Sequence, residues 1–244
     1  MKRLKFFLAI MFCLVACVLN AQIETNITWE YPIKPGSYEW KMTSYDEKVE
    51  KSQPPKELME RWDTETLFKY CVAYPFNHVI LMFNNPNDGF RRAYEQATVW
   101  QVFIRRNNAV DAIGKYFEAH PYKILFEMDN IKVRNGDLLT MYFLEKLVSE
   151  TDFTTLIDSF QKRKLMEIML ESHQSKKEFP DDIFGFPYNS SLCAILKILE
   201  SDQVMSSNDE ISMTTFRKQT RNESFVDDNM DAAITAKALD YLNK

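Results

Sequence analysis

Residues 63–120 decide the fold and read DTETLFKYCVAYPFNHVILMFNNPNDGFRRAYEQATVWQVFIRRNNAVDAIGKYFEAH. Apolar residues recur in this stretch at the spacing of a helix face, and the first such stripe consists of Leu67, Tyr70, Cys71 and Tyr74. Asp63 stands where a helix N-cap belongs, and Pro75 ends the helix that follows it. The stretch therefore predicts short amphipathic helices that pack against one another through their apolar faces.

The middle of this stretch contains an apolar run and a polar run. Residues 79–83 are apolar on every side, which predicts a short helix that is fully buried. Residues 84–89 read NNPNDG, a composition typical of a turn. Further helical stripes are formed by Phe90, Tyr94, Ala97, Trp100, Phe103 and Ile104, and then by Val110, Ile113 and Phe117.

The helical pattern continues through the second half of the chain. We expect a loop around Asn135 and Gly136, followed by a helix that Asp137 caps. Apolar spacing then predicts helices up to about His173, and another helix that begins at Asn189 or Ser190. The last amphipathic helix carries Met230, Ile234, Ala238 and Leu242 on one face.

Composition agrees with a helical fold. Hydrophobic residues make up 45% of the chain and aromatic residues 14%, which is enough for a substantial core. Only five glycines are present in 244 residues, so glycine-rich phosphate loops and glycine-built β turns are nearly excluded. We therefore predict an all-α protein with a short extended N-terminal lead-in. Its helices form either an irregular bundle or a short α-solenoid of the armadillo or HEAT type.

The N-terminus has the pattern of an export signal. Residues 1–21 begin with basic residues and continue with an apolar run, as a secretory signal peptide does. Two processing sites stay open, because residues 14–17 resemble a bacterial lipobox with Cys17 as the lipidated residue, whereas Ala21 fits ordinary cleavage. We expect a protein of the periplasm or outer membrane, or a secreted one, with membrane attachment only through a lipid on Cys17.

Four segments are expected after the export signal. Residues 22–54 form an extended lead-in, in which alternating aromatic residues give a weak hairpin signal. Residues 55–200 form the helical domain, beginning with a short helix from Lys56. Residues 201–226 are polar and read as a linker, and residues 227–244 form the C-terminal helix.

Charge and cysteine content exclude some classes of protein. The net charge of −5 becomes −8 if the signal, which carries three basic residues, is removed. Basic residues are scattered among acidic ones, so we do not expect nucleic acid as a partner. Cys71 and Cys193 both lie in apolar helical patterns and fit two buried thiols better than a disulfide framework.

Motifs for catalysis or metal binding are not found in the sequence. The three histidines lack zinc-ligand spacing, and His78, which adjoins an apolar run, is expected in the core. Asp227, Asn229 and Asp231 copy the start of a calcium-binding loop, but its glycine and glutamate positions are alanines, so acidic residues at a helix start explain them. We expect no cofactor, no metal and no enzymatic activity.

Several short motifs within the stretch that decides the fold, and just before it, are similar to those of one family. They are Trp40, Gln53-Pro54, Thr64-Glu65-Thr66-Leu67, Cys71, Tyr74-Pro75-Phe76, Gly89 and Arg105-Arg106. Through them, residues 36–119 resemble a family of exported proteins of gut Bacteroidetes. The resemblance implies a signal peptide followed by a helical domain of no established activity. Some relatives add an Asn-Cys-His motif of cysteine amidases, but Cys193 is followed by Ala194, so that activity is not implied here.

Three hypotheses of function follow. The first is a non-enzymatic protein-interaction module of the bacterial cell envelope, with a protein partner. The second is a glycan- or peptide-binding module that uses exposed aromatic side chains, with Trp29, Trp40, Trp62 and Trp100 as binding candidates. The third and least favoured is an enzyme with an unrecognised site.

Overall fold

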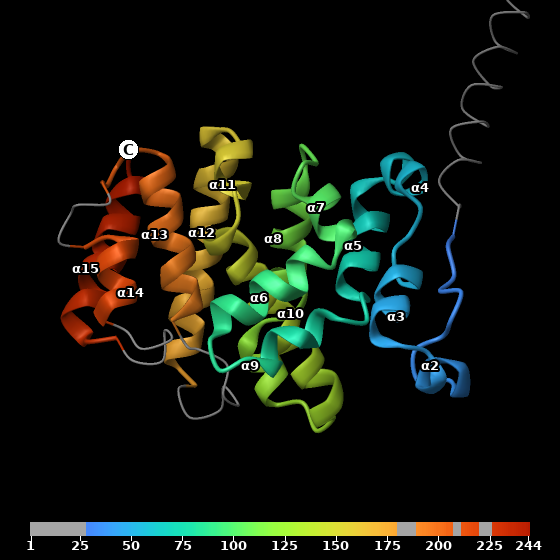
Figure 1. The fold of residues 1–244 in the computed structure, drawn as a ribbon. Coiled ribbons are helices and arrows are strands. Elements are labelled where there is room, and N and C mark those ends of the chain that lie inside the picture. Colours follow the sequence, from blue (N-terminus) through green and yellow to red (C-terminus); the bar gives the residue numbers. More distant parts are fainter. Residues whose placement is uncertain (1–27, 180–188, 207–210, 220–225) are drawn as a thin grey trace, which may run out of the picture.

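The computed structural model describes residues 28–179, 189–206, 211–219 and 226–244. All regular elements in these ranges are helices, and they contain no β-strand (Figure 1). The predicted all-α class is therefore confirmed. The export signal, with Cys17 and Ala21, lies outside the described residues, so the choice between the two processing sites stays open.

The helices follow one another in short lengths along the chain. The first half contains α2 (Tyr38–Met42), α3 (Tyr45–Lys51), α4 (Lys56–Arg61), α5 (Thr64–Val72), the 3-10 helix η1 (Asn77–Met82), α6 (Pro86–Glu95), α7 (Thr98–Phe103) and α8 (Ala109–Ala119). The second half contains α9 (Tyr122–Phe126), α10 (Ile131–Glu150), α11 (Phe153–Leu156), α12 (Ser159–Lys177), α13 (Ser190–Ser201), α14 (Met213–Gln219) and α15 (Asp228–Leu242). None of the described helices is both long and apolar enough to cross a membrane.

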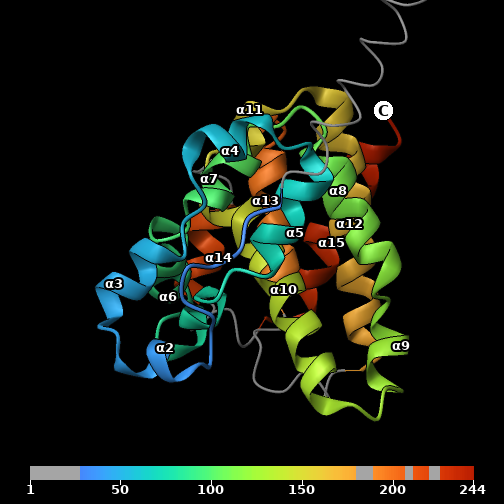
Figure 2. The same ribbon diagram turned by 90° about the vertical axis from the view of Figure 1, so that its right-hand side faces the viewer.

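Two rows of helices make up the body of the molecule. In one row α5, α8, α12 and α15 pack side by side, and in the other α7, α6, α10, α13 and α14 do so. Figure 2 shows α8, α12 and α15 on one side of the molecule and α6 and α14 on the other. The arrangement is a helical bundle, and the α-solenoid alternative stays a prediction.

The core lies between these rows and is rich in aromatic rings. Trp100 from α7 is fully buried and stacks on Phe143 of α10, with 4.9 Å between the ring centroids. Phe90 of α6 packs against the same Phe143 ring at 5.0 Å. One continuous cluster of buried apolar side chains therefore joins the two halves of the chain.

Helix caps confirm several boundaries read from the sequence. The Asp63 carboxylate accepts a hydrogen bond from the backbone N–H of Thr66 at 2.6 Å, which holds the first turn of α5. Asp227 caps α15 in the same way through Asn229. The first helix of the predicted helical domain, α4, begins at Lys56 as expected.

The extended lead-in is wrong for residues 38–51, which form the helices α2 and α3. Ser37 accepts a hydrogen bond from the N–H of Trp40, and Ser44 accepts one from the N–H of Glu47. These two serine caps start the helices. The alternating aromatic residues resembled a strand because five residues are too few to separate a period of 2 from one of 3.6.

The predicted turn at residues 84–89 is also wrong, because it contains the start of α6. Asn85 caps this helix by accepting a hydrogen bond from the N–H of Asn87 at 2.9 Å, and Pro86 occupies the first helical position. Gly89 lies inside the helix, where it lets the backbone of η1 approach closely. Asn-Pro and Gly therefore mark a helix start and a close contact here rather than a turn.

Residues 79–82 form part of the 3-10 helix η1, Phe83 follows it, and this run is not buried on every side. Val79 and Ile80 face the core, but Leu81, Met82 and Phe83 are exposed, Met82 by 66%. The expectation of full burial is wrong because η1 packs against α6 and α10 on one side only. Three neighbouring apolar side chains are left on the surface as a result.

Two further boundaries differ from the prediction. The helix α10 begins at Ile131, capped by Asn130, and runs through Asn135 and Gly136 without a loop. Residues 201–226 include the helix α14, whose Phe216 is fully buried against the core. At Phe216, tertiary packing outweighs the local preference for a loop, whereas the exposed Gly136 is helical because the Asn130 cap starts α10 before it.

The two cysteines behave as expected. Cys71 and Cys193 carry fully buried thiols, and burial raises the pKa of the Cys71 thiol well above its ordinary value. They therefore act as small apolar side chains in the core.

Candidate functional site

The four tryptophans proposed as ligand-binding residues do not form an exposed platform. Trp100 is 0% exposed and Trp62 is 4% exposed, so neither can present a ring face to a ligand. The Trp100 indole N–H donates to the Asn77 side-chain oxygen at 3.0 Å inside the core. Trp62 stacks on Tyr70 with 4.2 Å between centroids. The predicted exposure of these two rings is wrong because both are needed to fill the core.

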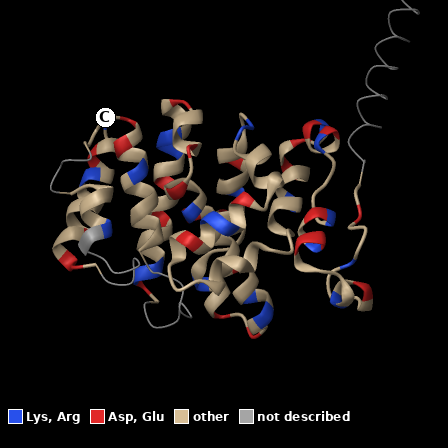
Figure 3. Ribbon diagram, viewed as in Figure 1, with Lys and Arg blue, Asp and Glu red and all other residues tan. Residues whose placement is uncertain are grey.

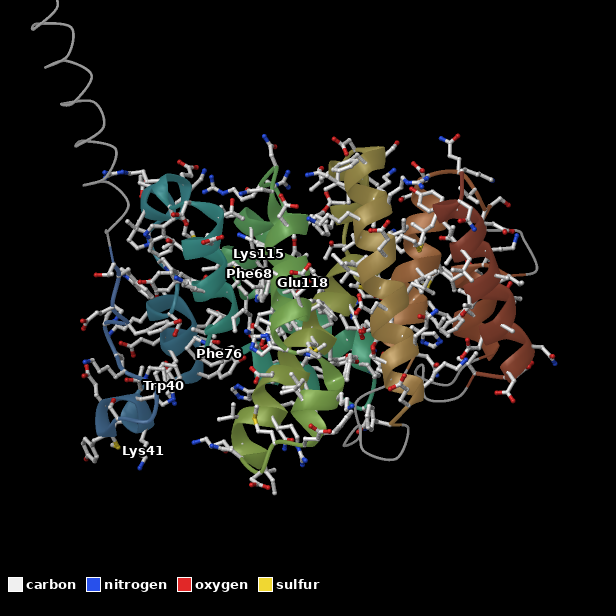
Figure 4. The ribbon with its side chains drawn as sticks, turned by 180° about the vertical axis from the view of Figure 1, so that it is seen from behind. Trp40, Lys41, Phe68, Phe76, Lys115 and Glu118 are labelled. Carbon is white, nitrogen blue, oxygen red and sulfur yellow. The ribbon has the colours of Figure 1, made fainter. Side chains whose placement is uncertain are left out.

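Trp29 and Trp40 are half-buried and hold the N-terminal segment on the helical body. The backbone N–H of Trp29 donates to the Tyr70 hydroxyl at 2.8 Å, and that hydroxyl donates back to the Trp29 carbonyl. Trp40 stacks on Phe76 at 5.6 Å, as Figure 4 shows, and the Lys48 ammonium lies over the ring. Most of the surface of both rings is therefore used within the chain.

Chemically active side chains do meet at one buried place, between α10, α12 and α13. The ammonium of Lys176 lies 2.5 Å from the Glu145 carboxylate, and both side chains are almost completely buried. Ser172 and Ser190 donate hydrogen bonds to the same carboxylate. A buried ion pair persists only when further hydrogen bonds satisfy it, and these two hydroxyls supply them.

A second group of polar side chains adjoins this ion pair and reaches α15. His173 lies with its Nε2 atom 3.1 Å from both carboxylate oxygens of Asp231, and its Nδ1 atom 3.3 Å from the Ser191 hydroxyl. Lys177 also pairs with Asp231, at 3.1 Å. The hydrogen-bond network assigns the tautomer in which Nε2–H donates to Asp231 and Nδ1 accepts from Ser191.

The charges in this group are set by burial and by the neighbouring ions. Burial lowers the pKa of His173, and the nearby Lys176 and Lys177 add to this effect, so the imidazole is neutral near pH 7. For Asp231, burial alone would raise the pKa. The contacts with His173 and Lys177 outweigh burial and hold the pKa below its usual range.

A hydroxyl, an imidazole and a carboxylate follow one another in space here, from Ser191 through His173 to Asp231. The catalytic triad of a hydrolase has the same arrangement of groups. Ser191 and His173 are both 0% exposed. A triad also needs space beside the hydroxyl for the reacting carbonyl group. In the part of the chain that the structure describes, neither residue lines any of the surface hollows discussed below. The arrangement joins α12, α13 and α15 through buried hydrogen bonds.

The buried network is not apparent from the sequence. Its pattern places His173 near a helix end and Asp231 among acids at a helix start, while His78, expected in the core, is exposed. One available signal was the pair Ser190-Ser191, which introduces two hydroxyls at the start of an otherwise apolar helix. A polar residue on an apolar helix face requires a buried partner.

A groove of about 290 Å³ opens on the surface between α5 and α8. Its apolar lining comes from Phe68, Ala112, Tyr116 and Ala119. An ion pair between Glu65 and Lys115 spans the two helices at its rim. Figure 4 shows Phe68 and Lys115 close together on this face. The groove can receive an apolar side chain of a partner.

A cleft of about 270 Å³ opens on the other side of α8, against α12. The α8 side of the cleft consists of Gly114, Phe117, Glu118 and the following Pro121. The α12 side consists of Ile168, Glu171, Ser172 and Ser175. Both sets have the spacing i, i+3, i+4, i+7, so each is one stripe along its helix. Tyr122 and Met141 complete the lining.

The helices are closest at one end of this cleft. A Cβ atom added to Gly114 would lie 3.1 Å from the Ile168 side chain, and Lys164 pairs with Asp111 at 2.7 Å beyond that point. At the other end of the cleft lies α9, whose Tyr122 hydroxyl is 3.4 Å from the Ser172 hydroxyl. The absence of a side chain at Gly114 thus permits the close contact from which the cleft widens.

Metal binding finds no support in the described residues. Across residues 28–179, 189–206, 211–219 and 226–244, no three His, Cys, Asp or Glu side chains converge as a metal site would require. Asp227 and Asp231, which resembled calcium ligands in the sequence, are used in the cap of α15 and in the contact with His173.

Comparison with known proteins does not assign the chain to a family. It matches no protein-family model, and no curated protein or solved structure is significantly similar to it. The resemblance of residues 36–119 to exported proteins of gut Bacteroidetes therefore stays a prediction. Function must be inferred from the surface geometry.

Proposed function

We propose that the protein is a non-enzymatic interaction module of the bacterial cell envelope that binds a partner protein on the face of α5, α8 and α12. The observation that carries the proposal is the pair of hollows that flank α8, the groove on one side and the cleft on the other. Both have apolar linings and charged rims, which is the composition of protein–protein contact surfaces. The place in the envelope rests on the export signal in the sequence.

A protein partner fits this face better than a single small molecule does. The two hollows lie on opposite sides of one helix, so a ligand that occupies both must cross α8. A peptide segment of a partner can do this by placing one side chain in each hollow. By contrast, the chemically active side chains of Ser191 and His173 are buried, which favours binding over catalysis.

Site-specific photo-cross-linking in living cells tests the proposal. A photoreactive amino acid replaces exposed Ala119 in the groove, and the matched control carries it at exposed Asp240 on α15. We expect one specific partner to be recovered from position 119 but not from position 240. The proposal fails if both positions give the same proteins, or if position 119 gives no specific product in repeated experiments.

A second candidate is a glycan- or peptide-binding module around Trp40. The observation in its favour is that Tyr38, on the same short helix as Trp40, is 79% exposed and leaves its aromatic ring on the surface. Aromatic rings of this kind stack on sugar rings. A glycan array that compares the wild type with Tyr38→Ala separates the two candidates, because only the glycan-binding proposal expects a loss of signal.

Membrane attachment through Cys17 is part of the proposed envelope location. Metabolic labelling with a fatty-acid analogue tests it in the wild type and in Cys17→Ala. We expect label in the wild type that Cys17→Ala loses. Absence of label from the wild type would leave cleavage after Ala21 as the processing route.

A further inference from the structure

The cleft between α8 and α12 is lined by one carboxylate from each helix, Glu118 from α8 and Glu171 from α12. Gly114 meets Ile168 where the helices are closest, and both helices then run from that contact toward α9. Glu118 lies four residues beyond Gly114, and Glu171 lies three residues beyond Ile168. A helix rises 1.5 Å per residue, so the two carboxylates stand at nearly the same level on opposite walls.

Neither carboxylate makes an ion pair or hydrogen bond among the contacts of the described residues. Lys115, three residues before Glu118 on α8, pairs with Glu65 across the groove and also interacts electrostatically with Glu118, while Lys164 pairs with Asp111. Both glutamates are exposed at the rim of the cleft. A cation placed in the cleft would have a carboxylate of opposite charge on each wall.

The lining of the cleft identifies the kind of cation. Below the carboxylates lie the side chains of Phe117, Ile168 and Met141, which are apolar, and the hydroxyl of Ser172. A bare metal ion would gain nothing from these apolar walls and would have only two carboxylates to bind it. A long basic side chain suits them, because its aliphatic part can cover apolar surface while its charged end reaches the carboxylates.

Arginine fits better than lysine. Its planar guanidinium presents several N–H donors in fixed directions and can bind two carboxylates at once, whereas the lysine ammonium acts as a single point charge. Figure 4 shows Glu118 on the part of α8 that faces α12. Figure 3 shows acidic and basic residues interspersed over the molecule. The groups that would select a cation are therefore those of the cleft itself.

We infer that the cleft between α8 and α12 binds an arginine side chain of the partner protein, held between Glu118 and Glu171 above an apolar floor. This inference rests on the proposed function, since it names the chemistry of the partner that this face would bind. The groove on the other side of α8 would then receive a neighbouring apolar side chain of the same segment.

A methyl NMR titration of the full chain tests the inference without the partner. Isoleucine δ1 methyl groups are labelled with ¹³C, and the Ile168 signal, assigned through Ile168→Val, reports on the cleft. The probe is N-acetyl-L-arginine methylamide. Its control is the citrulline analogue, which has nearly the same shape but no charge. We expect a saturable shift of the Ile168 signal with the arginine probe only.

Charge-neutral variants complete the experiment. Glu118→Gln with Glu171→Gln should raise the apparent Kd of the arginine probe about five- to tenfold, the effect of losing two exposed ion pairs. The matched control is Glu57→Gln with Glu167→Gln, which removes two exposed carboxylates outside the cleft and should leave Kd unchanged.

Three results would overturn the inference: no shift with the arginine probe, an equal shift with the citrulline probe, or the same Kd in the Glu118→Gln, Glu171→Gln variant. The cross-linking from Ala119 does not depend on the two glutamates. Recovery of a partner at position 119 together with a negative titration would therefore reject the arginine site and leave the proposed function intact.

Discussion

At the scale of single residues, Gly89 and Gly136 both lie inside helices but have opposite surroundings. A Cβ atom on Gly89 would collide with the backbone carbonyl of Ile80, whose carbon atom would lie 3.0 Å away. A Cβ atom on Gly136, inside α10, would meet nothing within 4 Å. The first glycine is required by tertiary contact, whereas the second only weakens its helix.

We predict opposite effects of alanine at these two positions. Gly89→Ala should lower the free energy of unfolding by about 1–3 kcal/mol, because η1 must move away from α6. Gly136→Ala should raise it by about 0.5–1 kcal/mol, because alanine has the higher helix propensity. Urea unfolding followed by circular dichroism measures both values, and a stabilising Gly89→Ala would contradict the close contact described here.

At the scale of elements, the long helices α10 and α12 are joined by an ion pair as well as by apolar packing. Glu145 comes from α10 and Lys176 from α12, and hydroxyls from α12 and α13 complete the hydrogen bonds of the carboxylate. Replacement of one partner leaves the other charge buried and uncompensated. Such a loss costs more than the ion pair itself contributes.

A double-mutant cycle should reveal this coupling. We predict that Glu145→Gln and Lys176→Met each cost about 3–5 kcal/mol of stability, and that the double variant costs clearly less than their sum. The control cycle uses the exposed pair of Glu65 and Lys115, whose coupling should stay below about 1 kcal/mol. Equal coupling energies in the two cycles, measured by urea unfolding, would show that burial of the first pair has no effect.

At the scale of the whole molecule, the C-terminal helix α15 is attached to the body through groups that titrate. His173 on α12 is faced by Asp231 of α15, by Lys176 and Lys177 of its own helix and by Ser191 of α13. Arg163 adds hydrogen bonds to the last carbonyls of α15. Protonation of His173 would place a further charge among buried groups, so it should weaken this attachment.

The sign of the pH effect follows from the lowered pKa of His173. Below about pH 6.5 the unfolded chain binds a proton that the folded protein does not, so stability falls as the pH falls. The lowered pKa of Asp231 removes further stability, but only as the pH falls below about 4.

We therefore predict that the free energy of unfolding decreases between pH 7 and pH 5, and that His173→Gln reduces this slope by up to about 1.4 kcal/mol per pH unit. Gln keeps a side-chain donor for Asp231 but does not titrate. His78→Gln is the control, since its side chain is exposed and does not touch α15. Urea unfolding across this pH range gives the slopes, and an unchanged slope in His173→Gln would exclude the histidine as its source.

The helices could largely be predicted from the sequence, because helix periodicity and caps act over a few neighbouring residues. The sequence identifies Asp63 as a cap and Asp227 as an acid at a helix start, and apolar spacing predicts α8, α12 and α15. The predicted helix boundaries are wrong where one residue type occurs in two kinds of local structure. Asn85 with Pro86 starts a helix in place of a turn, and Ser37 caps a helix in an apparent strand.

The candidate site could not be predicted, because its residues are far apart in the chain. Glu118 and Glu171 line the same cleft only because α8 packs on α12, and the close contact of these helices depends on the missing side chain of Gly114. The buried pair of Glu145 and Lys176 likewise depends on the packing of α10 and α12. Single positions in the sequence give no sign of which charges become neighbours.

The sequence by itself determined that this protein is helical, where most of its helices begin and end, and which side chains are available for its core. Those properties follow from short-range hydrogen bonds and from the 3.6-residue period of apolar residues. Only the tertiary structure decided that Trp62 and Trp100 are buried, that His173 is enclosed by polar partners, and that two hollows flank α8. The physical reason is that burial and surface shape depend on the packing of whole helices, which sums many weak contacts between distant parts of the chain.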